Sequence, residues 1–182
     1  MGNKKPVINY VYIDSERINH ACDAFMKWKD LNTFIKTIST RGINMPDALS
    51  EVMGCYCLGF LWNRGNVPGD ATDKSRKRKI EFKATSNFDS DLSSFGPETY
   101  FDDLYFLRFD LEENKLYIYD LGMNSETFAN TVMVNSKETV RMQQQAGRRP
   151  RVRIIESIIE PRGLKPMLVF DIRRVIIEKY EE

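Results

Sequence analysis

Two carboxylates and a lysine near the middle of the chain are spaced so that they can work together. Asp70 follows a Pro-Gly turn, and Glu81 and Lys83 lie on either side of Phe82 in a stretch with strand-like alternation. Because successive side chains of a strand point to opposite faces, Glu81 and Lys83 share a face. If a hairpin brings Asp70 beside Glu81, the two carboxylates are suited to Mg²⁺, and Lys83 can orient or deprotonate a water. The pattern predicts metal-dependent cleavage of a phosphodiester, with the carbonyl of Phe82 as a further metal ligand.

A purely structural role for the same residues has to be weighed against this one. Charged residues alternate on many amphipathic strands, so Glu81 and Lys83 can simply form a solvated face. The catalytic interpretation is favoured by the uncharged polar run that follows, from Thr85 to Asn87, where a buried strand would ordinarily stay apolar or end.

The sequence offers little other hydrolytic chemistry. Its one histidine, His20, falls in a stretch with helical periodicity, so histidine-based nucleases and triads are poorly supported. The chain has neither a Gly-rich phosphate loop that ends in Lys-Ser/Thr nor a dinucleotide fingerprint. Any hydrolysis must therefore depend on carboxylates, lysine and a metal.

Length and composition indicate one compact domain with a real core. The chain has 182 residues, of which 42% are hydrophobic and 12% aromatic, which argues against disorder. No apolar run is long enough to span a bilayer, and no signal peptide is recognisable, so no membrane association is expected. The three cysteines form neither an even disulfide set nor a zinc spacing, and we expect a cytoplasmic protein.

Hydrophobic periodicity predicts an α/β fold, with a central mixed sheet flanked by helices. Residues 1–62 are expected to be mainly helical, 67–122 to hold the catalytic strands, and 136–182 to hold a helix and loop and the C-terminal strands. The predicted helices cover residues 14–30 with a looser extension to 38, 46–60 with Pro46 in the first turn, and 136–145 capped by Ser136. The predicted strands cover residues 79–84, 104–109, 115–119, 151–155 and 167–172, with a loop at 63–69 and a turn at 161–163.

The motif and the longer phrases around it resemble a known family. Pro68-Gly69-Asp70 followed by Glu81-Phe82-Lys83 is similar to the PD-(D/E)xK nuclease motif, with a glycine between its proline and its aspartate. Together with three longer stretches it resembles the small Bsp-six-I-like family of type II restriction endonucleases over most of the chain. These stretches are residues 41–46 with Ser50-Glu51, residues 81–97, and residues 143–151.

The resemblance implies a Mg²⁺-dependent endonuclease of the PD-(D/E)xK fold that cuts duplex DNA at a short site, such as the interrupted palindrome GC-N-GC. Asp70, Glu81 and Lys83 would be its catalytic residues, with Asp73 as the alternative to Asp70. Glu51 would reach the metal site through water, or else be an exposed helical glutamate. A palindromic site implies a symmetric homodimer, and a cognate methyltransferase would act on the same DNA site.

The net charge is near zero, so only the distribution of charge along the chain is informative. Base contacts are expected from a second part of the chain. Arginine can bridge both acceptors of guanine in the major groove. The basic run at residues 74–79 would grip the DNA backbone or form a solvated hairpin tip. The candidates for DNA contact are Ser86, Asn87, Gln143, Gln144, Arg148, Arg149 and Arg151.

Two other functions remain open at this point. One is a repair or junction nuclease on the same fold that ignores base sequence. The other is a non-catalytic DNA-binding protein in which Glu81 and Lys83 are structural.

Overall fold

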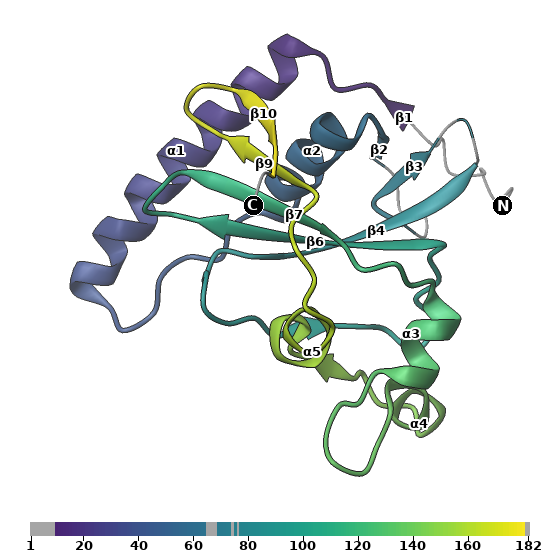
Figure 1. The fold of residues 1–182 in the computed structure, drawn as a ribbon. Helices are drawn as coiled ribbons and strands as arrows, with labels where there is room; N and C mark the ends of the chain where they lie inside the picture. Colours follow the sequence, from purple (N-terminus) through teal and green to yellow (C-terminus); the bar gives the residue numbers. More distant parts are fainter. Residues whose placement is uncertain (1–9, 65–68, 74, 76, 181–182) are drawn as a thin grey trace, which may run out of the picture.

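In the computed structural model, which describes residues 10–64, 69–73, 75 and 77–180, a mixed sheet lies between two layers of helices (Figure 1). The prediction of an α/β fold with a mixed central sheet is confirmed. Within those residues the sheet has eight strands, in the order β1-β2-β3-β4-β6-β7-β9-β10. They are β1 (Tyr10–Val11), β2 (Leu61–Asn63), β3 (Ala71–Asp73), β4 (Arg78–Thr85), β6 (Asp103–Asp110), β7 (Lys115–Asp120), β9 (Leu168–Asp171) and β10 (Ile176–Lys179).

One pair of neighbouring strands, β4 and β6, is parallel, and the other pairs are antiparallel. A parallel pair needs a crossover connection. Residues 86–102 supply it and carry β5 (Ser93–Ser94), which pairs with β8 (Arg151–Val152) in a separate two-stranded sheet. The crossover follows β4, the strand that carries Glu81 and Lys83. It therefore lies beside β8, a segment from much later in the sequence.

The first helical layer consists of α1 (Ser15–Ile38) and α2 (Asp47–Leu58), which pack on one face of the sheet. Asp14 caps α1 as predicted, since its carboxylate accepts a hydrogen bond from the backbone N–H of Arg17 at 2.9 Å. The predicted apolar stripe is buried in α1 and comprises Ile18, Cys22, Phe25 and Trp28. The helix continues to Ile38, as the looser pattern indicated.

The second predicted helix is correct in place but differs at both ends. Pro46 precedes α2 as its N-cap instead of lying in its first turn, and Gly59 ends the helix with φ +70°. Phe60 is buried beyond the helix, and the chain then enters β2. The predicted loop at 63–69 therefore begins one residue too early, because Asn63 pairs with Tyr10 of β1.

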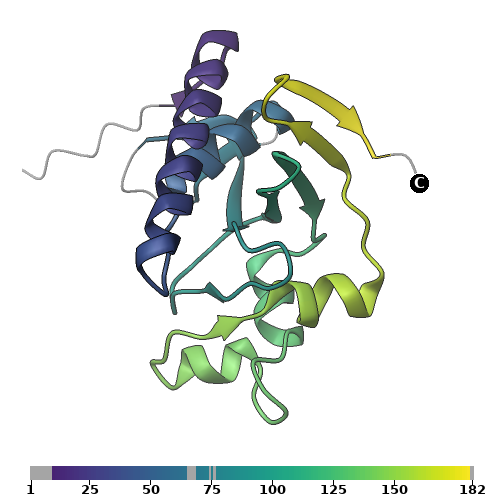
Figure 2. The same cartoon turned by 90° about the vertical axis from the view of Figure 1, so that its left-hand side faces the viewer.

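The second helical layer covers the other face, as Figure 2 shows after a quarter turn. It contains α3 (Ser125–Thr131), α4 (Val140–Gln145), a π-helix (Ile155–Ile159) and α5 (Glu160–Arg162). The sequence analysis missed α3. The predicted turn at 161–163 is wrong for the first two of its residues, which are helical, while Gly163 ends α5 with φ +58°.

The predicted helix at 136–145 begins too early. Ser136 lies in a turn closed by Asn135, whose side-chain oxygen accepts from the backbone N–H groups of Lys137 and Glu138. The N-cap of α4 is Thr139, which accepts from the N–H of Met142 at 3.3 Å. Gly147 follows the helix with φ +70°, consistent with the predicted stop.

Strand β6 is the centre of the fold and is buried on both faces, as its nearly continuous apolar run predicted. Leu104 and Phe106 pack into the core under α3 and the π-helix, while Tyr105 and Leu107 pack into the core under α1 and α2. The predicted hairpin between β6 and β7 is also present.

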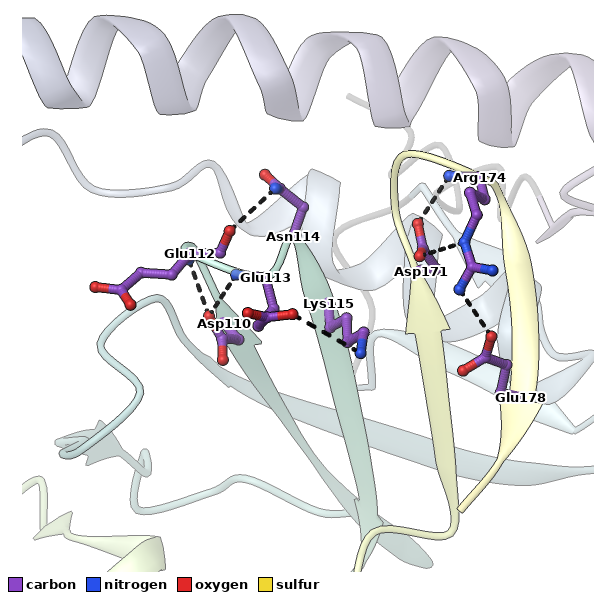
Figure 3. A network of polar contacts seen from close by, with 8 residues as sticks. All are labelled: Asp110, Glu112, Glu113, Asn114, Lys115, Asp171, Arg174 and Glu178. Atoms are coloured by element: carbon purple, nitrogen blue, oxygen red, sulfur yellow. Dashed lines mark hydrogen bonds and ion pairs between the residues drawn. The ribbon is translucent and has the colours of Figure 1, made fainter. Parts of the chain in front are cut away.

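Polar contacts close the two hairpins nearest the edge of the sheet, and Figure 3 shows both. At the β6–β7 turn, Asp110 accepts from the N–H groups of Glu112 and Glu113, both at 2.9 Å. At the β9–β10 turn, Asp171 accepts from the backbone N–H of Arg174 at 2.8 Å and from its guanidinium at 2.6 Å. These contacts hold the edge without involving the strand that carries Glu81.

Within the described residues, no helix combines the length and apolar character needed to cross a membrane.

The buried carboxylate of Asp91 joins the crossover to the C-terminal half. It is 8% exposed and accepts from the backbone N–H groups of Ile154 and Ile155, both at 2.9 Å, and from the Ser93 hydroxyl at 3.3 Å. These bonds hold β5 against the start of the π-helix, and they thereby fix the position of the crossover that follows β4.

Asp91→Asn is expected to lower the free energy of unfolding by about 1–3 kcal/mol, because one backbone N–H would then face an amide N–H₂ in a buried site. Urea unfolding followed by circular dichroism measures the change. The matched control is Asp89→Asn at an exposed position of the same loop, where we expect a change within about 0.5 kcal/mol. Equal effects of the two substitutions would contradict this account of Asp91.

Candidate active site

Asp70 is fixed to β4 by both its backbone and its side chain. Its N–H donates to the carbonyl of Ile80 at 2.8 Å, and its Oδ2 accepts from the N–H of Phe82 at 2.7 Å. Gly69 precedes it with φ +91°, and a Cβ there would lie 3.3 Å from the Ile80 carbonyl oxygen. The glycine between the proline and the aspartate of the motif is therefore what this tight turn onto β4 requires.

Glu81 and Lys83 form an ion pair on one face of β4, as the alternation predicted. Lys83 Nζ lies 2.7 Å from Glu81 Oε1, and both side chains are largely buried, with 20% and 10% exposed. The Lys83 ammonium also lies 4.9 Å from the centre of the Phe95 ring. The carboxylate and the ring together hold the ammonium in one place.

Glu51 comes from α2 and faces the same region. Its Oε2 accepts from the indole N–H of Trp62 at 2.7 Å. Burial raises the pKa of Glu51, the indole bond opposes this, and Asp47 and Glu81 raise it further. The negative charge of Glu81 therefore acts on the Glu51 carboxylate.

A hollow of about 340 Å³ lies over these groups. It is formed where α2, the end of β3 and β4, the crossover and the segment before β8 meet. Its lining includes Asp47, Ser50, Glu51, Asp70, Phe82, Lys83, Ser93, Ser94 and Arg149. Glu81 lines a neighbouring hollow of about 350 Å³ with Gly69 and Tyr100, so the Glu81–Lys83 pair lies between the two.

The electrostatics of the pair of carboxylates are unfavourable in the absence of a cation. Burial, followed by the charge of Glu81, raises the pKa of Asp70 to about 7, although the N–H of Phe82 and the charge of Lys83 act in the opposite direction. The repulsion between the half-buried Asp70 and the buried Glu81 is what a bound cation would relieve.

The donor set fits Mg²⁺ better than a metal that needs a complete protein cage. Among the residues that the structure describes, no three His, Cys, Asp or Glu side chains converge closely enough to hold a metal ion. Asp70 Oδ1 and Glu81 Oε2 take no hydrogen bond from those residues. Mg²⁺ is commonly held by one or two carboxylates with waters and substrate phosphate completing its octahedron, and two carboxylates are what the site provides.

Asp73, the alternative first carboxylate, lies at the far end of the β3–β4 hairpin. It pairs with Arg78 across the strands and accepts from the N–H and the hydroxyl of Ser75 at 3.0 and 2.7 Å. This location separates it from the Asp70 end of β3. Pro68 of the motif, and Lys74 and Arg76 of the basic run at residues 74–79, lie outside the described residues.

The cysteines and the histidine are poorly placed to act as nucleophiles. Burial raises the pKa of the Cys22 thiol to about 12 and also raises the pKa of the Cys55 and Cys57 thiols. His20 lies exposed on α1.

Of the residues predicted to contact DNA, Arg149 alone lines the hollow that holds Asp70 and Lys83. Arg151 is exposed on β8, opposite Ser94 of β5. Gln144 is half-buried and donates to the carbonyl of Gly96 at 2.9 Å, so it ties α4 to the crossover. Gln143 and Arg148 both bind Glu138, a residue that the sequence analysis did not single out.

Ser86 and Asn87 are not brought to the catalytic hollow. They line a separate polar hollow of about 920 Å³, together with Arg41 and Asn44 from the chain before α2. The sequence analysis also missed Phe95 and Asp91, because their contacts join segments far apart in the chain and leave no local signal.

Two carboxylates beside a lysine, with an arginine lining the same hollow, form an arrangement suited to the hydrolysis of phosphate esters. Comparison with known proteins makes the class definite. The family model for the Bsp6I restriction endonuclease matches residues 13–161. A curated relative, the type II restriction enzyme Bsp6I of Bacillus sp. (strain RFL6), is 42% identical over 165 residues, which cover 91% of this chain and 94% of the relative.

The chain therefore belongs to the Bsp6I restriction endonuclease family, and the resemblance found in its sequence is confirmed. Its class is that of the type II site-specific deoxyribonucleases. No solved structure matches the chain.

The unusual pKa of Asp70 can be tested without metal. In the metal-free protein, carboxyl titration by NMR should place this pKa near 7, so that Asp70 carries a proton below that pH and is ionised above it. Glu81→Gln should lower the pKa, because it removes the neighbouring negative charge and leaves Lys83 in place. The internal control is Asp102, whose pKa is lowered chiefly by the N–H of Lys79 and should not move. An Asp70 pKa near 4 in both proteins would contradict the proposed proximity.

Proposed function

We propose that the chain is a Mg²⁺-dependent endonuclease of the PD-(D/E)xK superfamily that hydrolyses both strands of duplex DNA at a short GC-rich palindrome. The observation that carries this proposal is the buried Asp70–Glu81 pair, with its raised Asp70 pKa, beside the Lys83 ammonium. A bound Mg²⁺ would supply Lewis-acid stabilisation of the phosphate and a water of lowered pKa.

Each residue of the candidate site then has a separate task. The carboxylates of Asp70 and Glu81 and the carbonyl of Phe82 would hold the ion, and Glu51 would contact it through water. Lys83, held as an ammonium by Glu81 and the Phe95 ring, would orient the attacking water or stabilise negative charge on the scissile phosphate. Arg149, in the same hollow, would contact a backbone phosphate.

Membership of the family supports a proposal for the substrate and the assembly. The relative is named as a type II restriction enzyme, and we propose that this chain cuts GC-N-GC or a closely related site. A palindrome cut on both strands needs two active sites, which a symmetric homodimer of single-domain subunits supplies. A cognate methyltransferase would modify the same DNA site, and DNA in the cytoplasm would be the substrate.

The catalytic assignment predicts that Asp70→Asn and Lys83→Ala each lower the cleavage rate by roughly 10²-fold or more and leave DNA binding largely intact. Single-turnover cleavage and a gel-shift assay in parallel separate the two effects. The chain offers matched controls. Asp73→Asn tests the alternative carboxylate, and Lys115→Ala tests the other Glu-x-Lys of the chain, whose ammonium lies 4.0 Å from Glu113 (Figure 3). Loss of cleavage in the controls but not in the first pair would overturn the assignment.

The substrate assignment is tested by digesting a sequenced plasmid with Mg²⁺. We expect discrete bands whose ends, when sequenced, all lie within one short GC-rich palindrome, and we expect no cleavage when EDTA replaces Mg²⁺. A smear would favour a sequence-independent nuclease. Discrete bands that persist in EDTA would contradict the metal requirement.

A further inference from the structure

Glu138 gathers three polar side chains into one cluster near the catalytic hollow. Its carboxylate pairs with both terminal nitrogens of the Arg148 guanidinium, and Oε2 also accepts from Gln143 Nε2 at 3.1 Å and from Asn135 Nδ2 at 3.0 Å. The N–H of Arg148 donates to the carbonyl of Gln143 at 2.9 Å. We call Asn135, Glu138, Gln143 and Arg148 the Glu138 cluster.

The cluster fixes Arg148 without using up its hydrogen-bonding capacity. A guanidinium has five N–H donors, and the contact with Glu138 uses one on each terminal nitrogen. The edge formed by Nε and one terminal nitrogen keeps its donors, and the Arg148 side chain is 50% exposed. This edge has the geometry that bridges O6 and N7 of guanine in the major groove.

Pairing with a carboxylate also changes what the arginine prefers to bind. An unpaired arginine is attracted to any phosphate, and that attraction carries no sequence information. The charge of Glu138 cancels that of Arg148, and Arg148 lowers the pKa of Glu138 to about 2, so that the pair persists at neutral pH. A neutral pair with donors held in place favours hydrogen bonding to base edges over attraction to phosphates.

The position of the cluster fits such a role. Arg148 is the chain neighbour of Arg149, which lines the hollow of Asp70 and Lys83. The same segment is tied to the crossover by the bond from the Phe95 N–H to the Pro150 carbonyl at 3.0 Å. The Glu138 cluster and the hollow of Lys83 are therefore joined through adjacent residues of one segment.

We propose that Glu138 is a specificity-determining positioning residue, which holds Arg148 and Gln143 as a preformed unit that reads the guanine of one G·C pair in each half-site. The inference rests on the proposed function, because it requires a sequence-specific site. It adds that discrimination at one base position depends on a carboxylate that need not touch the DNA.

The test is Glu138→Gln, which keeps the shape of the side chain and removes its charge. Wild-type and variant enzymes cleave the same sequenced DNA with Mg²⁺, and sequencing of all fragment ends gives the relative rate at each site. In the variant, discrimination should fall by roughly 5- to 150-fold at one G·C position and its symmetry mate, with the other positions unchanged. Arg148→Lys, which keeps the charge but loses the fork, should relax the same position.

Binding to non-specific duplex gives a second readout. Freed from Glu138, Arg148 becomes a phosphate ligand, and the salt dependence of log K should steepen by about 0.9 for Glu138→Gln. The matched control is Glu178→Gln, which removes a carboxylate from another exposed arginine pair, with Arg174 at 2.9 Å on the β9–β10 hairpin (Figure 3). It should change neither the cleavage pattern nor the salt slope.

The results distinguish failure of the proposed function from failure of the role proposed for Glu138. A wild-type enzyme without base preference would overturn the proposed function and this inference with it. A wild-type enzyme with clear preference, together with unchanged or uniformly slowed cleavage in Glu138→Gln and Arg148→Lys, would overturn the role of Glu138 alone. Thermal unfolding of each variant shows whether a uniform loss comes from instability.

Discussion

The candidate active site depends on the hydrogen bond from the backbone N–H of Phe82 to the carboxylate of Asp70. This bond continues the β3–β4 ladder with a side chain and forces a carboxylate against the strand that carries Glu81. The like charges are tolerated because Lys83 neutralises one of them and a strand N–H stabilises the other. What results is a pair of like charges whose repulsion a bound cation would relieve. Through this bond the short strand β3 helps to position a carboxylate of the candidate site.

The parallel pairing of β4 with β6 determines what surrounds that site. Since the chain must cross over, the residues after Lys83 return across the sheet and form β5, which β8 then joins. Phe95 contributes its ring to Lys83 from this crossover and its N–H to Pro150 in the arginine-bearing segment. The Lys83 ammonium and the arginine-bearing segment are thus connected through a single two-stranded ribbon, so a shift of one would displace the other.

Sequence patterns predicted the parts of the fold that depend on local order. The capping aspartate and apolar stripe of α1 and the apolar run of β6 are short-range signals, and the structure contains both. The spacing of Asp70, Glu81 and Lys83 also predicted their proximity, whereas their catalytic roles stay predictions. The three-residue strands β2 and β3 were missed because so few residues show no periodicity. Ser136 and Thr139 are both good caps, and the turn made by Asn135 decides between them. The partnership of Glu138 with Arg148 has no local signal, because the fold alone brings the two together.

The ribbon of β5 and β8 also has a consequence for the order in which the enzyme becomes complete during synthesis. Asp70, Glu81 and Lys83 emerge from the ribosome first, and Arg149, Pro150 and β8 follow only after β6, β7, α3 and α4 have been made. An unfinished chain therefore holds its chemical groups without the segment that closes the hollow and fixes Phe95. We expect such chains to be inactive on DNA. Late completion of the hollow would then limit DNA cleavage to chains that already carry β8.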